Sequence, residues 1–156
     1  MIGPANPRPL PALVARPLRA GERDLMAKTL AKAGLPADDL GQPSQLLFRF
    51  DTAGQLLAGF GGLEICDSFA LMRSVVTLPP LRGRGFGRAI VAALEAEAAM
   101  RKCEAIHLLT ETTQDFFEAL GYREVRREDV PPAIRSTAQF SGICPASATV
   151  LMKRLA

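Results

Sequence analysis

The chain has 156 residues, and 48% of them are hydrophobic, which is enough for one domain with a buried core. Its 19 Lys and Arg residues against 16 Asp and Glu residues give a formal net charge of only +3, which argues against a nucleic-acid-binding protein. No apolar run reaches the ~20 residues that span a bilayer, and the proline-rich start does not resemble a signal peptide. We therefore expect a cytoplasmic protein that binds neither nucleic acid nor membrane.

The first half of the chain predicts an arm, a strand, a helix and three more strands. Residues 1–11 contain four prolines and no periodic pattern, so we expect a loosely ordered arm before a single domain of residues 12–156. Residues 12–18 predict a strand, and apolar residues at helical spacing predict a helix over 20–34. Three β-rich runs separated by turn signals then predict an antiparallel meander over 45–51, 54–66 and 68–78.

The second half adds strands that alternate with helices. A helix is predicted over 85–100, a strand over 105–110, a short helix over 113–120 and a strand over 122–127. Residues 128–145 predict a turn, a short helix that starts at proline and a loop, and residues 147–155 predict the last strand. A meander followed by these units indicates a mixed α/β sheet with helices on its faces.

The cysteine and histidine content gives no indication of a metal site. Cys66, Cys103 and Cys144 are odd in number and far apart, which fits neither a disulfide framework nor paired zinc ligands, so reduced thiols are expected. His107 is the only histidine of the chain, and no second metal ligand lies near it in sequence. We expect a structural or surface role for it.

Three glycines, Gly83, Gly85 and Gly87, alternate with arginines directly before the predicted helix over 85–100. Glycine allows a tight turn and a close approach to the backbone, and a helix N-terminus attracts anions. The stretch lacks the Gly-Lys-Ser/Thr of a P-loop and does not follow the first strand of a dinucleotide-binding unit. It is either an anion-binding loop or a surface turn with solvated arginines, and we favour the first.

Two motifs in this order resemble the GNAT family of N-acetyltransferases. Arg82-x-x-Gly85-x-Gly87 between a strand and a helix resembles the family's pyrophosphate-binding signature, and "FFEALGYREV" resembles its late helix, Leu-Gly-aromatic turn and sixth strand. The resemblance covers roughly residues 12–155. It implies a central, mostly antiparallel sheet with helices on both faces, and an enzyme that moves the acetyl group of acetyl-CoA to a small-molecule amine without a metal.

The resemblance also implies the residues of the cofactor site. In the family, backbone amides of the loop hold the CoA pyrophosphate, a splayed strand contacts the pantetheine arm, and a backbone N–H, here at Thr77, supports the oxyanion. The implied cofactor residues are Val75, Val76, Thr77, Arg82, Gly83, Arg84, Gly85, Phe86, Gly87, Arg88, Thr110 and Phe117.

The usual catalytic side chains of the family do not all carry over. Phe117 stands where many members have a tyrosine as general acid, Thr110 where an asparagine is frequent, and Arg73 where an acidic residue is common. Phenylalanine cannot donate a proton, so water could protonate the CoA thiolate while Glu111 or Glu64 relays a proton from the amine. For each glutamate, the alternative is a solvated or paired carboxylate.

Arg73 lies among apolar neighbours, so its charge needs a partner or an opening to water. We interpret it as a clamp for an anionic, amino-acid-like acceptor, with an internal salt bridge, for example to Glu64, as the alternative. Ser74, Arg135 and Cys144 complete the predicted acceptor side, the last two in a segment, 131–148, that would wall or cover the site. Cys144 is alternatively a small packed residue, a soft arsenic ligand or a proton source.

A narrower resemblance concerns N-acetyltransferases of the second type from arsenic-resistance gene clusters. It rests on the strings "LLTETT", "PPAIRST" and "CPASA" and implies a toxicant acceptor, although no residue by itself indicates arsenic. The missing tyrosine supports a rival hypothesis, a CoA-binding sensor that regulates a protein partner without catalysis. A homodimer is compatible with the sequence.

Overall fold

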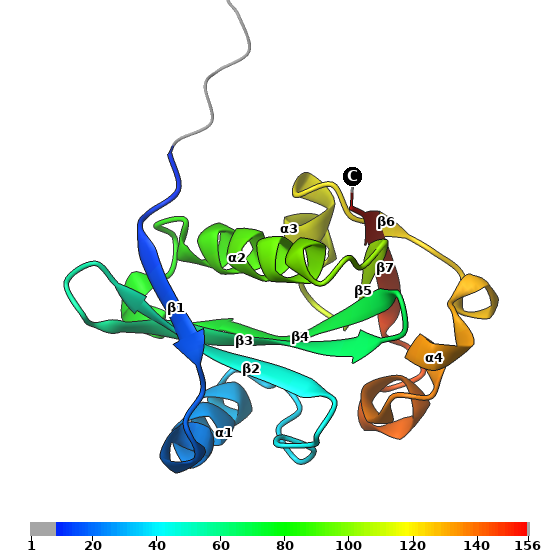
Figure 1. Ribbon diagram of the computed structural model, residues 1–156, viewed down its shortest axis with the longest axis horizontal. Helices are drawn as coiled ribbons and strands as arrows, with labels where there is room; N and C mark the ends of the chain where they lie inside the picture. The colour runs from blue at the N-terminus through cyan, green and yellow to red at the C-terminus, as the bar shows by residue number, and fades with distance from the viewer. Residues whose placement is uncertain (1–8, 156) are drawn as a thin grey trace, which may run out of the picture.

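A computed structural model describes residues 9–155, without the side chain of Ile143. These residues form a seven-stranded sheet with the strand order β1-β2-β3-β4-β5-β7-β6. Neighbouring strands are antiparallel except for β4 and β5, which are parallel. Helices cover both faces of the sheet (Figure 1), so the predicted mixed, mostly antiparallel α/β fold is confirmed.

The elements follow the predicted order closely. The strands are β1 (Leu13–Pro17), β2 (Gln45–Thr52), β3 (Leu57–Cys66), β4 (Phe69–Thr77), β5 (Ala105–Thr110), β6 (Arg123–Glu124) and β7 (Thr149–Arg154). The helices are α1 (Arg23–Lys32), α2 (Phe86–Met100), α3 (Gln114–Ala119) and α4 (Pro132–Arg135). The predicted meander corresponds to β2, β3 and β4.

Two predictions for the last third of the chain are wrong in detail. The strand predicted over 122–127 is reduced to β6 and one further backbone bond from Val125 to Val150 of β7, because residues 127–129 form a 3-10 turn. The loop predicted after the short helix contains a π-helical turn at Gln139–Ile143. Thr137 holds the chain there, since its hydroxyl donates to the C=O of Ile134 and accepts from the N–H of Phe140. Such local bonds leave no periodic pattern in so short a segment.

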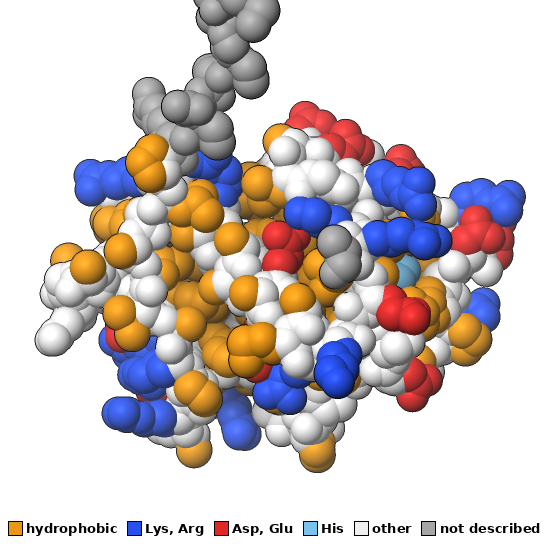
Figure 2. Space-filling model, turned by 45° about the horizontal axis from the view of Figure 1, so that its top comes forward, with side chains coloured by type: hydrophobic (Ala, Val, Ile, Leu, Met, Phe, Trp, Pro, Cys, Tyr) orange, Lys and Arg blue, Asp and Glu red, His pale blue; other side chains and the backbone are white. Residues whose placement is uncertain are grey.

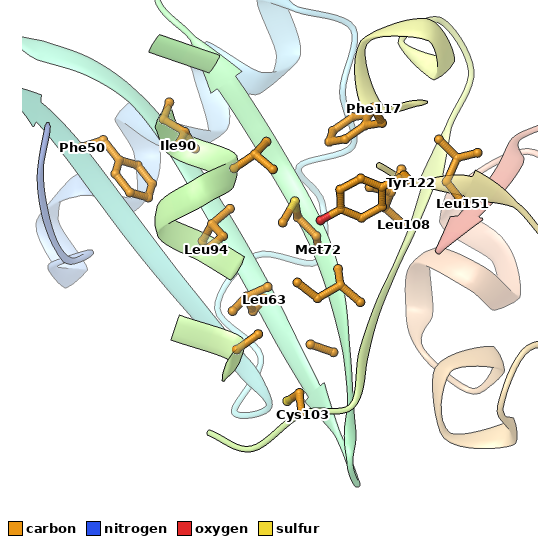
Figure 3. Packing of buried hydrophobic residues seen from close by; sticks show 14 residues of the cluster. Phe50, Leu63, Met72, Ile90, Leu94, Cys103, Leu108, Phe117, Tyr122 and Leu151 are labelled. Carbon is orange, nitrogen blue, oxygen red and sulfur yellow. The ribbon is translucent and has the colours of Figure 1, made fainter. Parts of the chain in front are cut away.

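The largest cluster of buried side chains lies between the sheet and the helices α2 and α3. Ile90, Leu94 and Ala98 recur every fourth residue on one face of α2, and they pack against Leu63 and other residues of the sheet (Figure 3). Burying one large apolar side chain stabilises the fold by about 1.5–3 kcal/mol. This packing fixes the N-terminal end of α2 over the middle of the sheet.

The opposite face of the sheet, beneath which Figure 1 shows α1 and α4, carries two smaller apolar clusters. One contains Met26 and Leu30 of α1 with Val76 of β4, and the other contains Ile134 of α4 with Leu71 of β4. Between Leu71 and Val76 on the same strand, the structure places a buried group of charged side chains in place of apolar packing.

The ends of the domain bear on two further predictions. Most of the predicted arm lies outside the described residues. At its described end, the ring of Pro11 lies beside residues 82–88, which we call the glycine loop, and 3.3 Å from where a Cβ on Gly85 would be. Within residues 9–155, we find no helix with the length and apolar character that a membrane span requires.

Candidate active site

Strands β4 and β5 separate after a short paired segment. Residues 69–71 of β4 pair with residues 105–107 of β5, and no further pair between these strands follows among the described residues. The remainder of both strands, up to Thr77 and Thr110, is therefore not joined by backbone pairs, and we call this break in the ladder near the middle of the sheet the opening. Unpaired strand edges present backbone N–H and C=O groups that a ligand can bind.

A β-bulge on β4 lies at the start of this opening. Gly61 of β3 stands opposite two residues of β4, Ser74 and Val75. The extra residue of a bulge is left without a ladder partner and bends its strand. Ser74 has a φ of 60°, a conformation that costs a residue with a side chain roughly 1–2 kcal/mol. The strand is thus bent and locally strained where it leaves β5.

The direction of the backbone groups beyond the bulge follows from the pairing with β3. In an antiparallel pair, successive residues face the two sides of the strand alternately. The N–H of Leu78 donates to Ala58 of β3, and Val76 pairs with Phe60, so Val76 faces β3 and Thr77 faces the opening. The backbone groups of Val76 are therefore directed to β3, which argues against the predicted cofactor contact at this residue. Val75 and Thr77 remain candidates for backbone contacts, and the C=O of Thr77 accepts a hydrogen bond from Arg82.

The glycine loop lies beside Thr77, at the N-terminal end of α2. Gly85 is the N-cap residue with a φ of 86°, which glycine adopts without strain. The first helical hydrogen bond runs from the N–H of Ala89 to the C=O of Gly85, so the N–H groups of residues 86–88 are free of the helix. A Cβ on Gly87 would lie 3.4 Å from Phe116 and 3.5 Å from Thr77 Oγ1. The helices α2 and α3 and the strand β4 thus come together at Gly87, which has no side chain.

The arginines of this loop carry uncompensated charge. Arg82, Arg84 and Arg88 form no ion pair within residues 9–155. Figure 2 shows basic side chains on this face separated by hydrophobic and neutral surface, rather than one continuous basic field. Free N–H groups, a helix dipole and three cations suit a compact anion such as a pyrophosphate.

Arg73, beneath the opening, is fully engaged by protein groups. Its Nη1 and Nη2 contact Asp39 Oδ2 and Oδ1, each at 2.5 Å, and Nη1 also lies 2.7 Å from Glu64 Oε1. The guanidinium is entirely buried. The alternative considered from the sequence, an internal salt bridge to Glu64, is therefore present, and no donor pair of this fork is left to clamp an acceptor carboxylate. We correct the predicted role of Arg73 accordingly.

Nothing in the sequence indicated Asp39, because its partner Arg73 is distant in the chain. It lies in the loop between α1 and β2, 34 residues from Arg73, and no periodic pattern marks it. Gln45 links this loop to the sheet, because its side-chain N–H groups donate to the C=O of Asp39 and to Glu64 Oε1. Glu64 thus receives bonds from Arg73 and Gln45, and the structure shows it as a paired carboxylate rather than a free proton relay.

Comparison with known proteins decides the family. Residues 44–124, more than half of the chain, match the family described as "Acetyltransferase (GNAT) domain". The chain belongs to the GNAT acetyltransferase family. The predicted resemblance is thereby confirmed at the level of the family, and the arsenic-resistance subtype is not part of that match.

Three similar proteins can be compared with this GNAT domain. A stretch of 53 residues is 45% identical to mouse N-alpha-acetyltransferase 80, over 34% of this chain and 17% of that protein. N-acetylglutamate synthase from Neisseria gonorrhoeae, complexed with coenzyme A and L-arginine, matches 93% of this chain and 34% of its own with a TM-score of 0.74 at 14% identity. A GNAT-family acetyltransferase from Staphylococcus aureus matches over 93% and 100% of the two chains, with a TM-score of 0.71 at 12% identity.

The chain thus spans 17% of the mouse enzyme and 34% of the synthase. At such low identities the structural matches support the fold alone. Acetyl-CoA is the co-substrate of the family, and the free backbone groups of β4 and α2 fit its pantetheine and pyrophosphate parts. Among residues 9–155 there is no group of three or more side chains suited to hold a metal ion.

The other predicted site residues of the GNAT domain fall into different environments. Phe117 is buried in the core, edge-to-face with Phe116 and Tyr122. Thr110 accepts a hydrogen bond from the N–H of Thr113 and so holds the start of α3. Glu111 is exposed directly after β5, and Arg135 is exposed on α4 without an ion pair to a described residue.

Cys144 ends the π-helical turn on the underside of the opening. Burial raises the pKa of its thiol, and the charges of Glu111 and Asp39 add to the rise while Arg73 opposes it. A protonated thiol is a weak metal ligand, which favours the packed role for Cys144 over the soft arsenic ligand. All three cysteines are free thiols.

Tyr122, the chain's only tyrosine, occupies a structural position. Its hydroxyl donates to Glu95 of α2 at 3.0 Å, and burial together with the Glu95 charge raises the pKa of Tyr122 far above its usual value. Figure 3 shows its ring beside Phe117 in the core. Tyr122→Phe removes a hydrogen bond to a charged carboxylate and should cost about 1.5–3 kcal/mol of stability, lowering the melting temperature by roughly 3–12 °C, while kcat stays unchanged. A tenfold or larger loss of kcat would instead make Tyr122 the general acid.

His107 is buried within β5, and its Nδ1 has no hydrogen-bond partner among the described residues. Its ring packs edge-to-face against Phe69 at 6.0 Å. The predicted structural role is thus supported, and burial lowers the pKa of His107.

Because the folded-state pKa of His107 lies below the unfolded value of about 6.5, the unfolded chain binds the extra proton first as the pH falls. Its contribution to stability is therefore complete above pH ~6.5 and is lost progressively below it. Urea unfolding of His107→Leu should show a shallower loss of stability between about pH 7 and pH 5 than the native chain. Equal slopes in the two proteins would contradict a buried neutral imidazole.

Proposed function

We propose that this GNAT domain transfers the acetyl group of acetyl-CoA to the amine of a small molecule. The proposal rests on two groups of the protein that lie side by side and could bind the two parts of one ligand. The glycine loop offers free N–H groups and cations for a pyrophosphate, and Thr77, directly beside it, has backbone groups that face the opening between β4 and β5. A long ligand with an anionic end and an extended arm fits this arrangement.

Acetyl transfer requires a neutral amine to attack the thioester carbonyl. A C–N bond forms, negative charge develops on the carbonyl oxygen, and the C–S bond then breaks with the electron pair passing to sulfur. The backbone N–H of Val75 or Thr77 is the proposed donor to the oxyanion. Glu111 is the remaining carboxylate free to take a proton from the amine, directly or through water, and solvent can protonate the thiolate.

The nature of the acceptor is the next part of the proposal. An anionic, amino-acid-like acceptor was inferred from Arg73, whose donors are occupied, so that preference now depends on the exposed cation Arg135. A toxicant that contains arsenic remains a proposal from the sequence resemblance. A cytoplasmic location and association as a homodimer are likewise proposals from the sequence.

Release of free CoA thiol tests the function. The full chain is incubated with acetyl-CoA and a panel of amines that includes amino acids, their amides, polyamines and an arsenic-containing amino-acid analogue with its arsenic-free counterpart. Thiol release above the rate without amine supports an acetyltransferase. Binding of acetyl-CoA without release on any amine would favour the rival function, a CoA-binding sensor, which the buried Phe117 in place of a proton donor supports.

A further inference from the structure

Ser74 combines several features that the fold alone does not require. It is 8% exposed, it lies at the bulge where β4 leaves β5, and its φ of 60° is unfavourable for a residue with a side chain. Glycine would occupy this conformation without strain. Strained residues that persist in a structure are concentrated at functional sites.

The Ser74 hydroxyl is oriented by the charged group beneath the opening. Its oxygen accepts a hydrogen bond from Arg73 Nε at 3.1 Å. Arg73 in turn is fixed by a two-point contact with Asp39 and a contact with Glu64. A hydroxyl that accepts from one side directs its own hydrogen elsewhere, and within residues 9–155 that hydrogen has no acceptor.

We propose that the Ser74 hydroxyl donates a hydrogen bond to the carbonyl oxygen of the bound thioester and stabilises the charge that develops there. It would act beside the backbone N–H of Val75, the next residue of the bulge. The buried guanidinium of Arg73 would then contribute in two ways. It positions the Ser74 hydroxyl, and its positive charge makes that hydroxyl a stronger hydrogen-bond donor.

In this role the Ser74 hydroxyl donates a hydrogen bond and does not transfer its proton. The serine keeps its proton while the amine adds to the carbonyl carbon and the C–S bond breaks, and the amine proton leaves to Glu111 or water. An aligned donor of this kind typically contributes about 10²–10³ in kcat. The inference rests on the proposed acetyltransferase function.

Two substitutions separate the hydroxyl from the backbone conformation. Ser74→Ala and Ser74→Gly both remove the donor, but only glycine relieves the strain at φ 60°. We expect kcat for acetyl transfer to fall about a hundredfold or more in both variants, with the calorimetric Kd for acetyl-CoA nearly unchanged. Lys102→Gly is the matched control, since Lys102 also has a positive φ, of 62°, and lies outside the opening. It should retain the native kcat.

The outcomes are distinct. Normal kcat in Ser74→Gly with a loss in Ser74→Ala would show that only the bend of the strand matters, and would overturn the proposed donor. Normal kcat in both variants would overturn it as well. A native chain that binds acetyl-CoA and transfers to no amine would instead refute the proposed function, and the Ser74 role with it. A raised Kd for acetyl-CoA at unchanged kcat would assign Ser74 to cofactor binding and contradict a role in catalysis.

Discussion

Replacement of Arg73 by alanine is expected to destabilise the domain strongly. The substitution leaves Asp39 and Glu64 buried together without their counter-charge, at 7% and 5% exposure. Breaking a buried ion pair by removing one partner costs about 3–5 kcal/mol, or roughly 6–20 °C in melting temperature for a domain of this size. Differential scanning calorimetry and urea unfolding at neutral pH measure the change.

The matched control is Arg126→Ala. Arg126 also faces two carboxylates, Glu128 and Asp129, but its side chain is 73% exposed. Exposed pairs contribute about 0–1 kcal/mol, so this variant should unfold almost like the native chain. If Arg73→Ala unfolds normally and instead raises the KM of acidic acceptors alone, Arg73 is a substrate clamp after all, and the internal pairing is not its function.

Gly87→Ala is expected to impair acetyl-CoA binding without harming the fold. The new methyl group would make only ordinary contacts, at 3.4 Å to Phe116 and 3.5 Å to Thr77, and alanine is a better helix former than glycine. The same methyl group would occupy the narrow space between α2, β4 and α3 beside the free N–H groups. Loss of one or two charge-assisted bonds at about 1.5–3 kcal/mol each predicts at least a tenfold weaker affinity for acetyl-CoA.

Gly21→Ala is the control for Gly87→Ala, because its Cβ would meet no atom within 4 Å and it lies in the 3-10 turn just before α1. Isothermal titration calorimetry with acetyl-CoA should separate the two variants. Gly85→Val should abolish binding altogether, since valine at φ 86° strains the loop as well as blocking it. Native affinity in Gly87→Ala and Gly85→Val would show that the ligand does not bind at this loop.

The sequence predicted the elements that have a regular pattern. The meander was predicted from alternating apolar residues and α2 from apolar residues at helical spacing. The glycine loop was predicted because glycines and arginines interrupt these apolar patterns between β4 and α2. The strand β6 was predicted but is shorter than expected, because its extent depends on pairing with the distant strand β7. The π-helical turn was missed because it depends on local hydrogen bonds over a few residues.

The chemistry of the site was less predictable, since it depends on pairs far apart in the chain. Arg73 stood out as a charge in an apolar strand, but its partner Asp39 could be identified only from the folded structure. The direction of the Val76 backbone likewise depends on register with β3 and on a bulge. One inserted residue changes which groups face the opening, and nothing in the side-chain pattern reports it.

Transfer of a labelled acetyl group is the most direct test of the function. The full chain is incubated with acetyl-CoA that carries ¹³C in the acetyl group and with the best amine from the panel, and the products are analysed by mass spectrometry. We predict labelled N-acetyl amine in a one-to-one ratio with released thiol, and its loss in Gly85→Val. Bound acetyl-CoA with no labelled amide on any amine would contradict the account and leave a cofactor-binding domain without acetyltransferase activity.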